Sequence, residues 1–89
     1  MLSVTQNAAE MITALTHRAD LSSGGLRIAQ QGTAPGLTMA VVPEPDAQDV
    51  VVLQHQVAVF LDPVAADRLA SDTLDARSTD EGAAFFLEP

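Results

Sequence analysis

The sequence predicts an α+β fold: a small domain of short, mixed but mostly antiparallel β-strands with one longer N-terminal helix and one short helix. Three observations predict this class. Apolar residues recur at helical spacing near the start of the chain, and short apolar runs separated by glycine, proline and acidic residues fill the rest. The segments between neighbouring runs are too short to hold helical crossovers. At 89 residues, we expect one domain over residues 1–89.

The longer helix is predicted directly after Thr5. Thr5 is a suitable N-cap, and the helix is expected to run to about Arg18, with Asn7 and Glu10 as an alternative capping box. Its core face consists of apolar residues three and four positions apart, namely Ala8, Met11, Ile12 and Leu15.

Short strands are predicted along the remaining chain. The expected strands are Leu2–Val4, Leu26–Gln30, Leu37–Val41, Val50–Leu53, Val57–Leu61, Thr73–Arg77 and Ala83–Leu87. In the second of them, Arg27 points outward between two inward apolar residues. Pro43–Asp46 is a loop and Asp80–Gly82 a turn. Gln54–Gln56 connects a hairpin, although it lacks the glycine that such turns favour.

The stretch Val57–Leu69 joins a buried strand to the short helix. Its strand carries apolar side chains on both faces. Asp62 is a good N-cap, and Pro63 fits the first helical position because its missing N–H is not needed there. We therefore expect a helix over Pro63–Ala70.

The charge balance narrows the choice of partners. Twelve acidic residues face four arginines, which gives a formal net charge of -8. Such a surface repels phosphate backbones and anionic lipid, so nucleic acid and membrane are excluded as expected partners, whereas a basic protein suits it. A chain of this length buries only roughly 60–65% of its unfolded surface, so a homo-oligomer would add stability. The N-terminus has neither a basic region nor a long apolar run, which predicts a cytoplasmic protein without a signal peptide.

Candidate metal ligands lack the spacing of a known site. His17 and His55 are the only histidines, and joining them to Asp20, Asp49 or Asp62 matches no ligand pattern. Two solvated imidazoles are the simpler interpretation. Glu44, Asp46 and Asp49 could bind a hard cation, but they lack the glycine-bearing calcium loop and are more simply a solvated acidic loop.

Candidate catalytic and ligand-binding segments are equally weak. Ser22–Gly25 precedes a strand rather than a helix, so it does not make a phosphate cradle. Ser71, His55 and Asp72 could be combined as a triad only without a nucleophile elbow. A small-molecule site in the loop Gly32–Gly36 remains open, because loops on a rigid scaffold often bind ligands.

Six segments, in order, resemble the HesB-like family, whose members include the A-type iron–sulfur carriers called IscA. The segments are VTQNAAEMI, GGLRIA, GLTMAVVPEPDAQD, VAVFLDPVAADRL, TLDA and GAAFFLEP. They resemble the family's first strand and helix, its Leu-Arg-Val strand, its Gly-aromatic strand with an acidic loop, its Asp-Pro step, its Ile-Asp-Tyr strand and its closing strand. The resemblance covers nearly the whole chain and implies the HesB-like fold.

The cluster ligands of that family are missing here. The family carries one cysteine in a Gly-Gly-Cys-Ser-Gly loop, which falls on Gly32–Gly36 and puts Ala34 at the cysteine position. The family's C-terminal Cys-Gly-Cys falls beyond Pro89. The chain has no cysteine at all, so it has neither disulfides nor thiolate ligands, and soft thiolate sulfur is what holds cluster iron.

Two hypotheses follow. The first is a non-catalytic relative of the iron–sulfur assembly carriers that acts as an interaction or regulatory module, with no catalytic residue, no cofactor and no metal site. The alternative is an iron-binding or assembly accessory protein that uses carboxylate and histidine ligands, such as Asp46 and Asp49, or a partner's thiols. No motif supports an enzyme.

Overall fold

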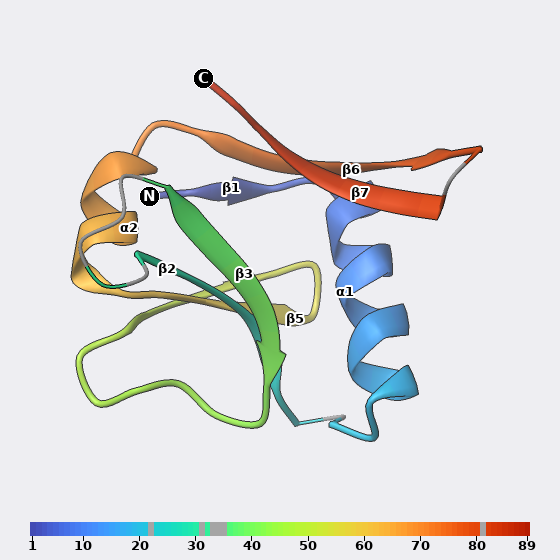
Figure 1. The fold of residues 1–89 in the computed structure, drawn as a ribbon, viewed down its shortest axis with the longest axis horizontal. Helices are drawn as coiled ribbons and strands as arrows, with labels where there is room; N and C mark the ends of the chain where they lie inside the picture. The colour runs from blue at the N-terminus through green and yellow to red at the C-terminus, as the bar shows by residue number, and fades with distance from the viewer. Residues whose placement is uncertain (22, 31, 33–35, 81) are drawn as a thin grey trace.

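The computed structural model describes residues 1–21, 23–30, 32, 36–80 and 82–89 (Figure 1). These residues form two helices and seven strands, which confirms the predicted α+β class. The helices are α1 (Gln6–Arg18) and α2 (Pro63–Arg68). The strands are β1 (Ser3–Val4), β2 (Gly25–Gln30), β3 (Leu37–Val42), β4 (Val50–Gln54), β5 (Val57–Leu61), β6 (Thr73–Thr79) and β7 (Gly82–Glu88).

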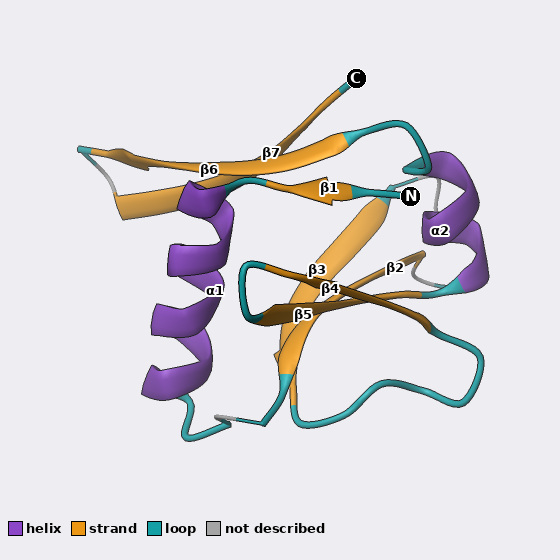
Figure 2. Cartoon of the chain, turned by 180° about the vertical axis from the view of Figure 1, so that it is seen from behind, coloured by secondary structure: helices purple, strands orange, loops and turns teal. Residues whose placement is uncertain are grey.

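The strands form two mixed sheets. One has the order β1-β6-β7 and the other the order β3-β2-β5-β4. The pairs β1–β6 and β2–β5 are parallel, and the remaining pairs are antiparallel. The three-stranded sheet lies across one end of the molecule above the four-stranded sheet, with α1 and α2 on opposite sides (Figure 2).

Helix α1 begins where its sequence predicts. The Thr5 hydroxyl accepts a hydrogen bond from the Ala8 N–H at 3.1 Å, so Thr5 is the cap rather than Asn7. The same hydroxyl donates to Asp75 Oδ1 on β6 at 2.7 Å. This single side chain therefore starts the helix and fastens it to the three-stranded sheet.

Helix α2 also begins as predicted but is shorter than expected. Asp62 Oδ1 accepts from the Ala65 N–H at 2.7 Å, and Pro63 occupies the first turn. The helix ends at Arg68, where Ala70 was expected, and Leu69 is its C-cap. Leu69 is buried against the core.

The β4–β5 turn is formed by two residues that are not glycine. His55 and Gln56 have φ values of 51° and 68°, both in the left-handed region. These signs are those of a type I′ turn, whose twist matches the flanking strands. The left-handed conformation costs free energy at these two non-glycine residues. The pairing of β4 with β5 stabilises the hairpin and holds them in it.

The core is aliphatic and lies between the two sheets and α1. It consists of Leu2, Val4, Ala8, Ala9, Ile12, Leu26, Ile28, Val52, Val57, Val59, Leu61, Ala65, Leu69, Leu74 and Ala76. Met11 and Leu15 of the predicted helical face are only partly buried, because they border a groove described below. Neither α1 nor α2 combines the length and the apolar character needed to cross a membrane.

Candidate functional site

The hairpin β2–β3 carries the position at which the family resemblance places a cysteine. Ala34 lies outside the described residues, as do Thr33 and Pro35. The two strands that frame it are described: Gln30 at the end of β2 pairs with Leu37 at the start of β3. The hairpin end lies beside the start of α2.

Asp62 ties this hairpin to α2 with both of its carboxylate oxygens. While Oδ1 caps the helix, Oδ2 accepts from the Gln30 N–H at 3.0 Å. The Asp62 N–H also donates to the Ile28 carbonyl at 3.2 Å. The sequence offered Asp62 as a metal ligand, but its oxygens are engaged by backbone amides.

Arg27 binds two carboxylates of the acidic loop that was considered as a cation site from the sequence. Its Nε and Nη2 donate to the two carboxylate oxygens of Asp49 at 2.8 and 3.0 Å, and Nη2 lies 3.0 Å from Asp46 Oδ2. The Asp46 N–H donates to Asp49 Oδ2 at 3.0 Å. The Asp49 side chain is only 2% exposed, so its charge is neutralised by the guanidinium rather than by water.

The protonation equilibria follow from this pairing. The hydrogen bond from Arg27 is the main cause that holds the pKa of Asp49 below its usual value, and burial opposes it. The same hydrogen bond raises the pKa of Arg27. A divalent cation at Asp46 and Asp49 would have to displace an arginine that binds both carboxylates.

The histidines do not assemble a site with the carboxylates. Among the described residues, no group of three or more His, Asp and Glu side chains is placed to hold a metal ion. His17 is exposed in the last turn of α1, and His55 is exposed in the β4–β5 turn.

The suggested triad is not assembled either. Ser71 and Asp72 follow α2, whereas His55 precedes β5. No hydrogen bond joins the described side chains of Ser71, His55 and Asp72 to one another.

The glycines of the predicted Ser22–Gly25 loop have a packing role. A Cβ on Gly24 would collide with the Val42 carbonyl oxygen, and a Cβ on Gly25 would collide with the Ala58 carbonyl oxygen. Glycine lets the start of β2 lie close to its two neighbouring strands. Ser22 itself lies outside the described residues.

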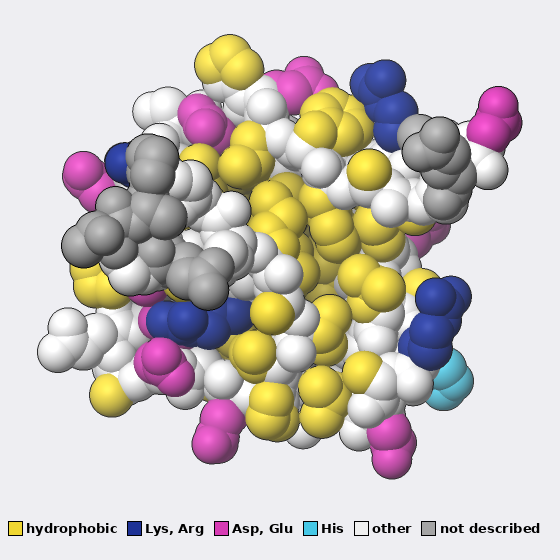
Figure 3. Space-filling view, viewed as in Figure 1, with side chains coloured by type: hydrophobic (Ala, Val, Ile, Leu, Met, Phe, Trp, Pro, Cys, Tyr) yellow, Lys and Arg dark blue, Asp and Glu magenta, His cyan; other side chains and the backbone are white. Residues whose placement is uncertain are grey.

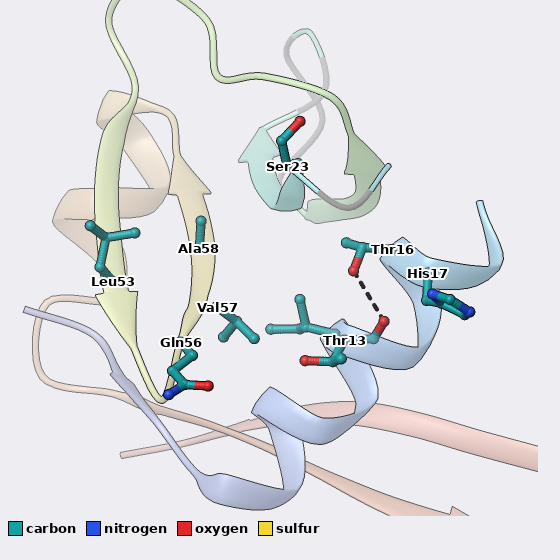
Figure 4. Close-up of a pocket in the computed structure, with 10 residues that line it drawn as sticks. Thr13, Thr16, His17, Ser23, Leu53, Gln56, Val57 and Ala58 are labelled. Atoms are coloured by element: carbon teal, nitrogen blue, oxygen red, sulfur yellow. Dashed lines mark hydrogen bonds between the residues drawn. The ribbon is translucent and has the colours of Figure 1, made fainter. Parts of the chain in front are cut away.

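A hollow of about 480 Å³ lies between α1 and the β4–β5 hairpin (Figure 4). Thr13, Thr16 and His17 of α1 line one side, and the Thr16 hydroxyl donates to the Thr13 carbonyl at 3.1 Å. Its opposite wall consists of Leu53, Gln56, Val57 and Ala58. None of the described residues that line it is an aspartate, a glutamate or an arginine, and together they present hydroxyl, amide and imidazole groups beside apolar ones.

A second groove lies between α1, β3 and β7, and it is mainly apolar (Figure 3). Its volume is about 430 Å³, and its lining includes Met11, Leu15, Met39 and Phe85, with Arg18 beside them. Leu37, Met39 and Val41 were expected on one face of β3; Met39 and Val41 line this groove, whereas Leu37 packs against the core.

Neither hollow and no ion pair of Arg27 was predicted from the sequence. The hollows arise where segments distant in the chain meet, so no local pattern marks them. The single arginine among the apolar residues of strand β2 could have indicated the ion pair, because burying an unpaired charge costs free energy.

Comparison with solved structures gives the fold a clear set of neighbours. A crystal structure of IscA with a [2Fe–2S] cluster is 23% identical, with a TM-score of 0.81 over 100% of this chain and 86% of that one. SufA of Escherichia coli, described as involved in biosynthesis of iron–sulfur clusters, is 22% identical with a TM-score of 0.80, over 98% and 83% of the chains. A protein from Aquifex aeolicus, solved in solution, is 23% identical with a TM-score of 0.77, over 99% and 90%.

These likenesses confirm the fold that the family resemblance implied. No family model matches the sequence, and no curated protein matches it. The chain therefore has the fold of the iron–sulfur assembly proteins IscA and SufA, and it has no cysteine.

Proposed function

We propose that this chain is a single HesB-like domain related to the iron–sulfur assembly carriers, that it binds no cluster and catalyses no reaction, and that it acts in the cytoplasm as a protein-interaction or regulatory module. One observation carries the proposal. The whole chain matches the fold of a cluster-bound IscA, and none of its 89 residues is a cysteine.

The chemistry of the remaining side chains supports the absence of a cluster. Cluster iron is held by soft thiolate ligands, and an alanine methyl group such as that of Ala34 cannot replace one. Hard carboxylate ligands would be the substitute. The carboxylate oxygens of Asp49, however, already accept hydrogen bonds from Arg27, and those of Asp62 accept from backbone N–H groups.

Anaerobic reconstitution with iron and sulfide tests this proposal. A carrier with all three cysteines is the positive control, and the matched variant of this chain is Ala34→Cys with Cys-Gly-Cys added after Pro89. We expect neither iron nor sulfide on the natural chain, and visible-region absorbance of a cluster on the control. Stoichiometric iron and sulfide on the natural chain would show the proposal to be wrong.

Uptake of iron alone would support the carboxylate alternative instead. The variant Asp46→Asn with Asp49→Asn would then lose the iron, whereas Glu88→Gln, far along the chain on β7, would keep it.

The interaction role is supported by the charge of the surface. A formal net charge of -8 favours a partner with a basic face. Binding to such a partner should weaken steeply with added salt, because exposed charges are screened. Binding unchanged by salt would contradict a charge-driven interaction.

A further inference from the structure

The apolar groove between α1, β3 and β7 lies where the two sheets end. Strand β3 ends the order β3-β2-β5-β4 and β7 ends the order β1-β6-β7, while α1 lines the third side. Leu26, which also lines the groove, is buried, whereas Met39 is 37% exposed and Phe85 is half-buried. Figure 3 shows the groove as a hollowed apolar area on this face of the molecule. The described chain thus leaves apolar surface open to an occupant.

Arg18 has the only charged side chain among the described residues that line this groove. Every other lining residue is an alanine, valine, leucine, methionine or phenylalanine. The methionines among them, Met11 and Met39, have flexible side chains that adapt to the shape of what they contact. The groove therefore offers one guanidinium and otherwise no side chain that donates a hydrogen bond.

The guanidinium of Arg18 is exposed at the end of α1 and forms no ion pair or hydrogen bond within the described part of the chain. Arg27, by contrast, pairs with Asp49. Arg77 lies 4.6 Å from the centre of the Phe86 ring. The end of a helix favours a cation such as Arg18, but that interaction leaves the donors of the guanidinium available.

We propose that this groove binds a medium-chain fatty acid, with its carboxylate on Arg18 and its alkyl chain on the apolar side chains of α1, β3 and β7. A guanidinium matches a carboxylate with two parallel hydrogen bonds. An alkyl chain needs no further polar partner, whereas a peptide would bring amide groups that these side chains cannot satisfy.

The size of the groove fits a ligand of this kind. At about 30 Å³ for each water-sized group, its volume of about 430 Å³ has room for roughly fourteen non-hydrogen atoms. A carboxylate with about twelve carbons contains that number of atoms. We therefore expect affinity to rise with chain length up to about this limit.

The acidity of the whole chain does not exclude this anion. The formal charge of -8 is spread over the surface, and exposed charges more than about 8 Å apart are largely screened at physiological ionic strength. No aspartate or glutamate is among the described residues that line the groove, so a bound carboxylate meets Arg18 there and no lining anion. The inference does not rest on the proposed function.

Calorimetric titration with decanoate, below the concentration at which it forms micelles, tests the proposal. The natural chain should bind one decanoate, and decanol should bind about tenfold more weakly because it has no charge to offer Arg18. Octanoate should also bind more weakly, since each buried methylene contributes up to roughly fourfold in affinity. No binding of decanoate, or equal binding of decanoate and decanol, would overturn the proposal.

Arg18→Gln tests the position of the carboxylate. It should weaken decanoate binding about tenfold and leave decanol binding nearly unchanged. The matched control is Arg68→Gln on α2, which removes the same charge on the opposite side of the molecule (Figure 2) and should bind decanoate as the natural chain does. Equal losses in the two variants would trace the effect to net charge and would overturn the proposal.

Met39→Gln tests the position of the alkyl chain. It places an amide in the groove and should weaken the binding of both decanoate and decanol. Leu53→Gln on β4 is the control, because Leu53 is 74% exposed and lies outside the groove, and it should change neither affinity. Circular dichroism checks that each variant keeps its fold.

Two further results would overturn the proposal. A loss in Leu53→Gln as large as that in Met39→Gln would show that decanoate binds to exposed apolar surface in general. Decanoate binding that weakens as the protein concentration rises would show that a second copy of the chain occupies the groove.

Discussion

The two helices begin with caps of different construction. At α2, one carboxylate does both tasks: Asp62 caps the helix and holds the Gln30 N–H of β2. At α1 a neutral hydroxyl does both tasks, because Thr5 caps the helix and donates a hydrogen bond to Asp75 Oδ1 on β6. The difference is one of charge: at α2 a carboxylate accepts both hydrogen bonds, whereas at α1 a neutral hydroxyl accepts one and donates the other, so the contact with the sheet there also needs Asp75.

The largest effect is expected from Asp62→Ala. The change removes the α2 cap and leaves the Gln30 N–H without its charged acceptor, so the free energy of unfolding should fall by about 3 kcal/mol. Urea unfolding followed by circular dichroism measures it. Asp62→Asn keeps one acceptor and should cost less. Equal losses for the two variants would mean that the second hydrogen bond contributes nothing.

A smaller effect is expected from Thr5→Ala. The cap of α1 is lost, but Asp75 can turn to water, so the cost should be about 1–2 kcal/mol. Thr5→Ser keeps the hydroxyl and serves as the control in the same unfolding experiment. A cost above that of Asp62→Ala would reverse the comparison between the two helix starts.

A still smaller effect is expected from Asp75→Asn, which keeps an acceptor for the Thr5 hydroxyl but loses the charge. Thr5→Ala combined with Asp75→Asn should cost less than the sum of the two single changes, because the first removes and the second weakens the same hydrogen bond. Strict additivity in a double-mutant cycle would argue against this shared hydrogen bond.

The pH dependence of the unfolding free energy tests the hydrogen bond between Thr5 and Asp75. The Thr5 hydroxyl and the Ala76 N–H hold the pKa of Asp75 below its ordinary 3.8. A lowered pKa in the folded state stabilises the protein above pH 3.8 and loses that contribution as the pH falls from 3.8 through the folded value. The natural chain and Asp75→Asn should therefore differ in unfolding free energy at neutral pH and converge in acid. A difference that persists unchanged in acid would exclude the Asp75 charge as its source.

These caps bear on the proposed loss of cluster binding. The Asp62 link places β2 and β3 beside α2 at the hairpin where Ala34 falls. A scaffold that keeps this link can hold its shape without a metal. We expect the variant with Ala34→Cys and an added Cys-Gly-Cys to keep the natural unfolding free energy in the absence of iron, which thermal unfolding measures.

Local sequence patterns accounted for much of the fold. Thr5 and Asp62 precede helices because their side chains reach N–H groups only three residues ahead, so neighbours in the chain are enough to predict them. The alternation around Arg27 predicted β2 in the same way. The turn of β4–β5 was predicted as a connection, but its left-handed backbone at His55 and Gln56 was not, because the segment lacks the glycine and asparagine that mark such turns.

The sequence by itself determined the order of the elements, the two helix starts, the acidic charge and the lack of thiolates. Only the tertiary structure decided which strands pair, how Asp62 reaches Gln30 across 32 positions, how Thr5 reaches Asp75 across 70, and that β4 is left at an open edge. The physical reason is the range of the interactions. Caps and alternation act between close neighbours in the chain, whereas parallel pairing, the Arg27–Asp49 ion pair and the exposure of Leu53 exist only after distant segments have packed together.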